Sequence, residues 1–208
     1  MRGRFIALEG GEGTGKSTQA SLLAAALAER GIACEVTREP GGTPGAEAIR
    51  TLLLDPALPG WEPAAEALLF AAARSDHVAK RIEPALKAGR WVICDRFVDS
   101  SLAYQGDAAG LGEGAIRTLH QIGSNGLYPD VTLLLDAGPD TTASRISARD
   151  GDATDKIGGR GATFHEAVAK AFDRLARTEP QRFRRIEASG TPQEVHVMVL
   201  NTLRDLLP

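Results

Sequence analysis

A run of eight residues at positions 10–17, Gly-Gly-Glu-Gly-Thr-Gly-Lys-Ser, has the residue types and spacing needed to hold a polyphosphate. It matches the pattern G-x-x-x-x-G-K-[ST], with Gly10 and Gly15 as the outer glycines, followed by Lys16 and Ser17. Glycines allow backbone N–H groups to converge on phosphate oxygens. The lysine is expected to reach the β and γ phosphates, and the serine hydroxyl to bind Mg²⁺. The run therefore predicts a phosphate-binding loop.

Charged residues at the end of another apolar run offer a second group of candidates. Asp95 and Arg96 follow Trp-Val-Ile-Cys at 91–94. A carboxylate at a strand end facing the loop is suited to hold Mg²⁺, directly or through water, and an adjacent arginine is suited to grip phosphate oxygens. The alternative is a surface ion pair or a helix cap. Asp136 is the rival metal-binding carboxylate, because Leu-Leu-Leu-Asp at 133–136 has the same character.

Further arginines have both a functional and an ordinary interpretation. Arg38 follows a predicted strand and suits an anionic acceptor, but the segment also fits a solvated turn. The arginines Arg145, Arg149 and Arg160 bracket a glycine-rich segment and suit a γ-phosphate, although exposed charges are common. Phe70 and Arg74 are four positions apart on a predicted helix. They share a helix face, on which the ring would stack on a nucleobase and the guanidinium would form hydrogen bonds to it. The alternative is that Phe70 is an ordinary core residue and Arg74 an ordinary solvated one.

Periodicity indicates how these residues are positioned. Short apolar runs predict strands at 4–9, 91–94 and 131–135, and further strands are predicted at 32–37 and 183–186. Helices are predicted at 17–30, 46–54, 62–86 (as one or two), 113–122 and 141–149, and two more open on capping boxes at 163–166 and 191–194. Strands alternating with helices predict a parallel sheet covered on both faces. Ligands of such sheets lie beyond the carboxyl ends of the strands, so the chemistry is expected just after residues 9, 37, 95 and 136.

Composition restricts the class of protein. The 208 residues fit one domain, 1–208, with a substantial core. A net charge of −3 gives no support to nucleic-acid binding. Cys34 and Cys94 are too few and too isolated for a disulfide framework or a metal site. No apolar run approaches a membrane span, and the N-terminal apolar stretch is too short for a signal peptide. We expect a soluble, cytoplasmic enzyme.

Several longer strings in the chain resemble those of bacterial thymidylate kinases. They are Phe5–Thr18, Thr-Arg-Glu-Pro-Gly-Gly-Thr at 37–43, Leu-Phe-Ala-Ala-Ala-Arg at 69–74, Asp-Arg-Phe at 95–97, Ser-Ser-Leu-Ala-Tyr-Gln-Gly at 100–106 and Tyr128–Asp136. They occur in family order over about two-thirds of the chain. The second and fifth strings are far more specific than the phosphate loop. The resemblance implies the P-loop NTPase fold: a three-layer α/β/α domain with a five-stranded parallel sheet and a mobile lid near 149–161.

The resemblance also implies an activity, transfer of phosphate from ATP to dTMP with Mg²⁺, and a role for each matching residue. The donor site would comprise Gly10, Gly11, Glu12, Gly13, Thr14, Gly15, Lys16, Ser17, Thr18, Arg145 and Ser189. The acceptor site would comprise Arg38, Pro40, Phe70, Arg74, Arg96, Ser101, Tyr104 and Gln105. Catalysis would involve Lys16, Arg96, Asp95, Glu12 and Arg149, with Ser17 and Asp95 at the metal. Members of the family are usually homodimers, with no membrane or nucleic-acid partner.

The segment expected to form the lid departs from the family pattern. It reads Arg-Asp-Gly-Asp-Ala-Thr-Asp-Lys-Ile-Gly-Gly-Arg at 149–160 and is richer in glycine and acidic residues than many bacterial lids. Three cations, Arg149, Lys156 and Arg160, are the candidates for reaching the γ-phosphate. A positive group from this segment is expected on charge grounds, because the phosphate loop contains no arginine.

The chemistry of the acceptor distinguishes the alternative functions. A monophosphate oxygen is already an anion, so it needs alignment and charge screening rather than a general base. A deoxynucleoside kinase would instead need a carboxylate to take the proton of a sugar hydroxyl, and Glu39 stands where such a base would lie. A partner-driven ATPase is the alternative of a different class, since a phosphate loop alone does not specify the reaction.

Overall fold

The computed structural model describes residues 2–150 and 155–207, apart from the side chains at 139 and 148–150. Within this part of the chain, five strands form one parallel sheet in the order β2-β3-β1-β4-β5. Their bounds are β1 Phe5–Glu9, β2 Cys34–Arg38, β3 Trp91–Asp95, β4 Val131–Asp136 and β5 Phe183–Glu187. The strand order reverses on either side of β1, and that is the position at which parallel sheets open a ligand crevice.

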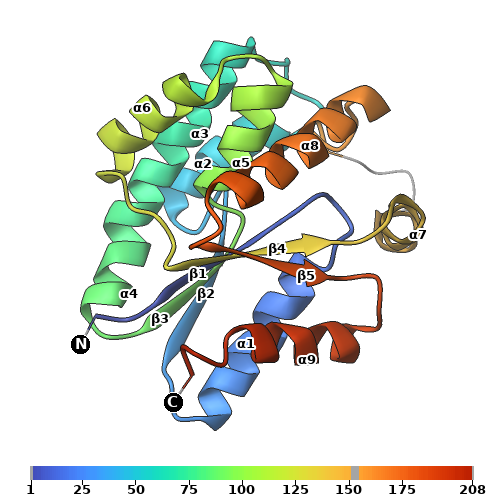
Figure 1. Cartoon of the computed structure of the whole chain (residues 1–208). Coiled ribbons are helices and arrows are strands. Elements are labelled where there is room, and N and C mark those ends of the chain that lie inside the picture. The colour runs from blue at the N-terminus through green and yellow to red at the C-terminus, as the bar shows by residue number, and fades with distance from the viewer. Residues whose placement is uncertain (1, 151–154, 208) are drawn as a thin grey trace.

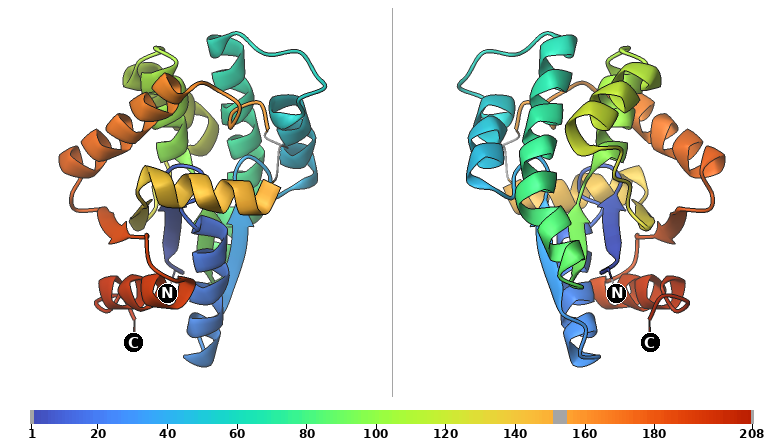
Figure 2. Two further views of the ribbon diagram at one scale, coloured as in Figure 1. Left: turned by 90° about the vertical axis from the view of Figure 1, so that its right-hand side faces the viewer. Right: turned by 90° about the vertical axis from the view of Figure 1, so that its left-hand side faces the viewer.

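Helical segments connect the strands and cover both faces of the sheet (Figures 1 and 2). Their bounds are α1 Lys16–Glu29, α2 Pro44–Leu54, α3 Pro63–His77, the π-helix η1 Val78–Ile82, α4 Glu83–Lys87, α5 Val98–Ser101, the π-helix η2 Leu102–Ala108, α6 Glu113–Ser124, α7 Pro139–Asp150, α8 Ala162–Thr178 and α9 Pro192–Thr202. No helix in the described part of the chain combines the length and apolar character needed to traverse a lipid bilayer.

The alternation of side chains along each strand creates two hydrophobic cores. Phe5 and Ala7 of β1 belong to the core beneath α3, α6 and α8, whereas Ile6 and Leu8 belong to the core beneath α1 and α9. All four side chains are fully buried. The predicted three-layer α/β/α architecture is therefore confirmed, and burial on both faces explains why these strands read as continuous apolar runs.

Of the two predicted capping boxes, the structure contains one. The predicted capping box at 163–166 is wrong: α8 begins at Ala162 after Gly161, so Thr163 lies inside the first turn and caps nothing. The second predicted box is confirmed, because Thr191 and Glu194 exchange both capping hydrogen bonds at the start of α9. The two sequence patterns are alike, but the helices begin at different positions relative to the threonine. Helix α8 begins one residue before Thr163, whereas α9 begins one residue after Thr191.

The segment 98–108 is helical although its sequence did not indicate it. It forms α5 and η2, and η2 packs against α6 and α8. Residues such as Ser100, Tyr104 and Gly106 have weak helix propensity, so tertiary packing overrides the local preference. The predicted helix at 62–86 is continuous but changes to π geometry at η1. Pro84 lacks an N–H to continue the regular pattern, and this is a known cause of such interruptions.

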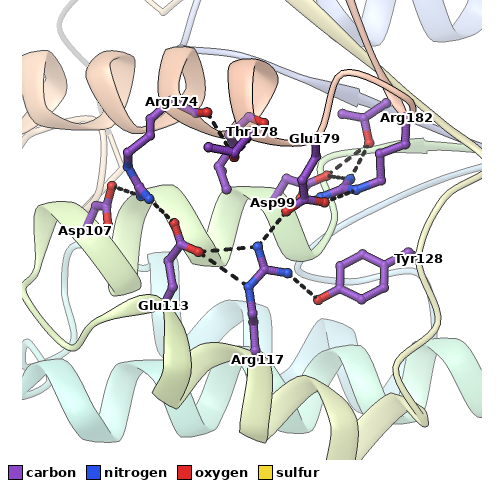
Figure 3. A network of polar contacts seen from close by, with 11 residues as sticks. Asp99, Asp107, Glu113, Arg117, Tyr128, Arg174, Thr178, Glu179 and Arg182 are labelled. Carbon is purple, nitrogen blue, oxygen red and sulfur yellow. Dashed lines mark hydrogen bonds and ion pairs between the residues drawn. The ribbon is translucent and has the colours of Figure 1, made fainter.

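A network of ion pairs joins α5, η2, α6 and α8 to the start of β5 (Figure 3). At its buried end, both terminal nitrogens of Arg182 donate to the Asp99 carboxylate at 2.6 Å. Arg117 bridges Glu179 at 2.6 Å and the Tyr128 hydroxyl at 3.0 Å. At its exposed end, the remaining contacts link Arg174 to Asp107 and Glu113. The network fixes α5 and η2, which carry Ser101, Tyr104 and Gln105, onto the sheet.

Candidate active site

The phosphate loop lies between the end of β1 and the start of α1. Gly10 has a φ of 135° and a Cβ there would lie 2.3 Å from the Leu135 carbonyl oxygen, so no larger residue fits. The Lys16 ammonium folds back and donates to the Gly11 carbonyl at 2.6 Å and to the Gly10 carbonyl at 3.3 Å. Burial, followed by repulsion from Arg96, lowers the pKa of Lys16 to about 7. A bound polyphosphate would supply the negative charge that this lysine lacks.

A hydroxyl and a carboxylate meet beside the loop. Ser17 Oγ donates to Asp95 Oδ2 at 2.5 Å, which joins the start of α1 to the end of β3. Asp136, the rival carboxylate, is exposed and lines neither of the pockets described below. The residue after Asp95, Arg96, has a φ of 68°, and its guanidinium donates to the Gly10 carbonyl at 3.0 Å. The phosphate loop and Asp95-Arg96 therefore form one unit.

Glu9 holds this unit together, although sequence reasoning did not single it out. Its fully buried carboxylate accepts hydrogen bonds from the Phe97 N–H at 2.7 Å and from the Ser100 hydroxyl at 2.6 Å. Burial, followed by the neighbouring Asp99 charge, raises the pKa of Glu9 to about 7. Glu9 ends β1 as Asp95 ends β3, so the same strand-end rule would have found it.

The first of two pockets lies on the β3 side of the loop and has a volume of about 330 Å³. It contains the predicted aromatic and polar residues of α3, α5 and η2: Phe70, Arg74, Ser101, Tyr104 and Gln105. The phosphate-facing candidates also line it: Glu12, Arg38, Pro40, Asp95 and Arg96. The helical face shared by Phe70 and Arg74 thus opens onto a cavity. We call this the acceptor pocket.

The second pocket lies between the phosphate loop, α7 and the start of α9 and has a volume of about 350 Å³. Its walls in the described part of the chain are residues 13–19, Arg145, Gly190, Pro192 and Val195. Arg145 donates to the carbonyls of Ala188 at 2.9 Å and Gly190 at 2.8 Å, which ties α7 to the loop after β5. We call this the donor pocket. The predicted Ser189 is exposed and does not line it, although its neighbour Gly190 does.

Among the described residues, the candidate lid cations Lys156 and Arg160 do not line either pocket. Lys156 Nζ donates to the Pro59 carbonyl at 3.0 Å, and Arg160 pairs with the buried Glu66 of α3. The side chain of Arg149 lies outside the described residues, as do residues 151–154. The structure therefore directs Lys156 and Arg160 toward α3 and the loop before it, and the described cations that contact the phosphate loop include Lys16, Arg96 and Arg145.

The acceptor pocket also contains residues that sequence reasoning missed, namely Arg50, Leu54, Asp155 and Ile157. Arg50 of α2 donates to the Pro40 carbonyl at 2.7 Å. Burial, followed by repulsion from Arg38, lowers its pKa. Its sequence neighbourhood is an ordinary amphipathic helix, so no local signal marked it. Only the packing of α2 beside α3 brings Arg50 to the pocket.

The fold and the site together define a class. A phosphate loop after the central strand of a parallel sheet, with a strand-end Asp-Arg pair beside it and a pocket on either side, is characteristic of P-loop proteins that bind two ligands across one loop.

Comparison with known proteins identifies the family within this class. The sequence model described as thymidylate kinase matches residues 8–199. The chain is 59% identical to the thymidylate kinase of Rhizorhabdus wittichii over the whole of both chains, and 47% identical to that of Bradyrhizobium diazoefficiens over 100% of this chain and 92% of the relative. The crystal structure of thymidylate kinase from Ehrlichia chaffeensis superimposes with a TM-score of 0.78 at 32% identity, covering 98% of this chain and 100% of that one. The chain belongs to the thymidylate kinase family.

Proposed function

We propose that the protein transfers the γ-phosphoryl group of ATP to the phosphate of dTMP, yielding ADP and dTDP. One observation carries the proposal: the donor and acceptor pockets both include Gly13, Lys16 and Ser17. Two ligands occupying these pockets would meet end to end over the phosphate loop. This is the arrangement that in-line phosphoryl transfer requires.

The donor pocket supports the binding of ATP. The backbone of residues 13–18 provides N–H groups for the phosphates, and the N-terminus of α1 adds a favourable dipole. Arg145 and the loop at Gly190 form a wall of the pocket beside which a nucleobase would lie. We propose that Ser189 contributes to this site at most through its backbone, because its side chain is exposed.

The acceptor pocket supports the binding of a thymine nucleotide. Phe70 offers a ring for stacking, while Arg74 and Gln105 offer hydrogen bonds to the base edge. Tyr104 lies beside the position of the sugar in this scheme. The phosphate would be gripped by Arg38, Arg50 and Arg96, three cations that line the end of the pocket next to Lys16.

The metal site fits Mg²⁺. Ser17 Oγ and Asp95 Oδ2 are hard oxygens 2.5 Å apart, and they lie where the two pockets meet. Among the described residues no cluster of three acidic, histidine or cysteine ligands occurs. That suits a cation which usually takes one or two protein oxygens together with phosphates and water. When bound, Mg²⁺ screens the β and γ phosphates.

No proton-accepting residue is needed for this acceptor. Lys16 and Arg96 would offset the charge that spreads over the transferred group. Glu39, the candidate base of a deoxynucleoside kinase, is occupied on both oxygens by Arg74 and His77. The geometry therefore favours a monophosphate over a nucleoside as acceptor.

We also propose the wider setting of this activity. The chain would act as a single domain, 1–208, with the segment 149–161 as its lid and Glu12 near the acceptor's sugar. It would work in the cytoplasm, where its nucleotide ligands occur, and as a homodimer. Leu68 of α3 and Ile122 of α6, which are 57% and 77% exposed, support the last point, because these adjacent helices present apolar side chains on one surface.

An ADP-release assay with the purified protein, ATP and Mg²⁺ tests the function. We expect rapid turnover with dTMP, little with dCMP, dGMP or AMP, and none with thymidine. Turnover of thymidine but not dTMP would establish the nucleoside kinase instead. ADP formation that requires an added protein rather than dTMP would support the partner-driven ATPase.

A further inference from the structure

A buried chain of four polar side chains runs beneath the acceptor pocket. It starts at Thr37 in β2, continues through His77 and Glu39, and ends at Arg74. The four side chains are between 0% and 6% exposed. Burying this many polar and charged groups is costly unless every one of them is paired, and a fully paired network is rigid.

Each link of the chain determines the orientation of the next. The Glu39 carboxylate can only accept, so His77 Nδ1, 3.0 Å from Glu39 Oε1, carries the hydrogen. In the neutral ring Nε2 then accepts from the Thr37 hydroxyl at 2.7 Å. Gly42 makes this possible, because a Cβ at that position would lie 2.4 Å from His77 Nε2. The string Thr-Arg-Glu-Pro-Gly-Gly at 37–42 therefore encodes one end of the network, and Arg74 and His77 of α3 encode the other.

At the pocket end, Arg74 is held on two sides. Its Nε donates to Glu39 Oε2 at 2.8 Å, and its Nη2 donates to the Ser101 hydroxyl at 2.8 Å. Phe97 lies beneath the guanidinium, with the Arg74 Cζ 5.5 Å from the ring centroid. Among the described residues, Nη1 has no hydrogen-bond partner. The guanidinium is planar, and hydrogen bonds hold its Nε and Nη2 atoms in place. The N–H groups of Nη1 therefore point in one fixed direction.

We infer that Glu39 is a positioning residue that fixes the direction of the free Arg74 nitrogen, and thereby makes the acceptor pocket select a base edge carrying a carbonyl oxygen. The inference rests on the proposed function, since it concerns how the acceptor pocket discriminates between bases. A guanidinium N–H donates and cannot accept. It pairs with a ring carbonyl and opposes an amino group at the same position.

The same contacts separate this role from that of a proton acceptor. A general base must reach the proton that it removes with a free lone pair. Each oxygen of Glu39 already accepts a charge-assisted or ring N–H hydrogen bond at 3.0 Å or less. Glu39 lines the acceptor pocket, but its side chain is only 4% exposed, so little of the carboxylate is open to a ligand. Glu39 acts on the acceptor through Arg74.

The variant Glu39→Gln tests the inference. The amide keeps the size of the side chain but removes its charge and one acceptor, so Arg74 and His77 are no longer both satisfied. With dTMP we expect KM and the equilibrium Kd to rise about 10- to 100-fold while kcat falls less than about threefold. The ratio of kcat/KM for dTMP to that for dCMP should fall by about the same factor as KM rises. KM for ATP should not change.

Two further variants complete the design. Glu35→Gln is the matched control, because Glu35 lies on β2, the strand that leads into Glu39, and bridges two arginines, Arg81 and Arg90, but does not line the acceptor pocket. It should leave the dTMP to dCMP ratio unchanged. His77→Gln alters Arg74 only through Glu39 and also lines no pocket. It should shift KM and the ratio in the same direction as Glu39→Gln, by a smaller factor, and it preserves the test if Glu39→Gln does not fold.

Two results would overturn the inference. One is an unchanged Kd and base ratio in both Glu39→Gln and His77→Gln. The other is a fall in kcat of about 10²-fold or more with KM unaltered, which is the signature of a lost general base. Failure of the unmodified protein to phosphorylate dTMP would instead overturn the proposed function, so the two failures are distinguishable.

Discussion

At the residue scale, Lys16 shows how burial lowers the pKa of a lysine whose proposed function is to bind phosphate. The lysine is 8% exposed and surrounded by backbone carbonyls and Arg96. Burial removes its hydration, and the nearby carboxylates of Asp95, Glu9 and Glu12 offset this loss only in part. A bound diphosphate supplies further negative charge and restores the usual preference for the protonated form.

This leads to a pH-dependent prediction. The pKa of Lys16 is about 7 without ligand, so at pH 8 the side chain is mostly neutral. Binding of ADP should raise the pKa and take up close to one proton at pH 8, whereas at pH 6 the lysine is already charged and uptake should be small. Calorimetric titrations in buffers of different ionisation enthalpy measure this uptake directly.

The control for proton uptake is Lys16→Arg. Arginine keeps its charge in both states, so the uptake at pH 8 should disappear even where ADP still binds. Equal uptake at pH 6 and pH 8, or uptake that persists in Lys16→Arg, would show that another group titrates.

At the scale of elements, the ion pair between Asp99 and Arg182 anchors α5 to the edge of β5. The Asp99 carboxylate is fully buried and accepts two hydrogen bonds from Arg182 (Figure 3). It also lies close enough to Glu9 to raise the pKa of that residue. Arg182 therefore neutralises the charge of the Asp99 carboxylate, which lies directly behind the turn that carries Arg96.

Removing the arginine should be costly. Arg182→Met leaves Asp99 buried without its counter-charge, and we expect a loss of about 3–5 kcal/mol in the free energy of unfolding. Arg174→Met removes an arginine from the exposed end of the same network, where the side chain is 46% exposed, and should cost no more than about 1 kcal/mol. Denaturant unfolding at pH 7 measures both. Similar losses for the two variants would contradict this ranking.

At the scale of the whole molecule, the surface formed by α3 and α6 predicts self-association. Leu68→Glu or Ile122→Glu should convert the proposed dimer into a monomer. The new carboxylate would be buried in the interface without a partner, facing either its own copy or an apolar side chain. Sedimentation velocity gives the mass. Val197→Glu is the matched control, since Val197 is 57% exposed but lies on α9, across the sheet. A monomeric unmodified protein, or association unaffected by the α3 and α6 variants, would contradict the proposal.

Local sequence was sufficient for the parts of the protein whose physics is local. The phosphate loop, the strand that precedes it and the helix that follows are contiguous, so spacing alone predicted them. All five strands were predicted to within about two residues, and apolar runs marked the three central ones, β3, β1 and β4, because a strand buried on both faces is mostly apolar. The string at 37–43 marked a functional turn, although its internal hydrogen bonds were not foreseeable.

Only tertiary structure brought residues distant in the sequence together. The meeting of Ser17 with Asp95, the arrival of Arg50 at the acceptor pocket and the orientation of Arg74 by Glu39 each depend on which strands are neighbours and how α2 and α3 pack. The helical form of 98–108 and the failure of the capping box at 163–166 have the same origin. The spacing of residues along the sequence specifies the structure that one segment forms by itself. The partner of a buried charge depends instead on how segments that are distant in the sequence pack together.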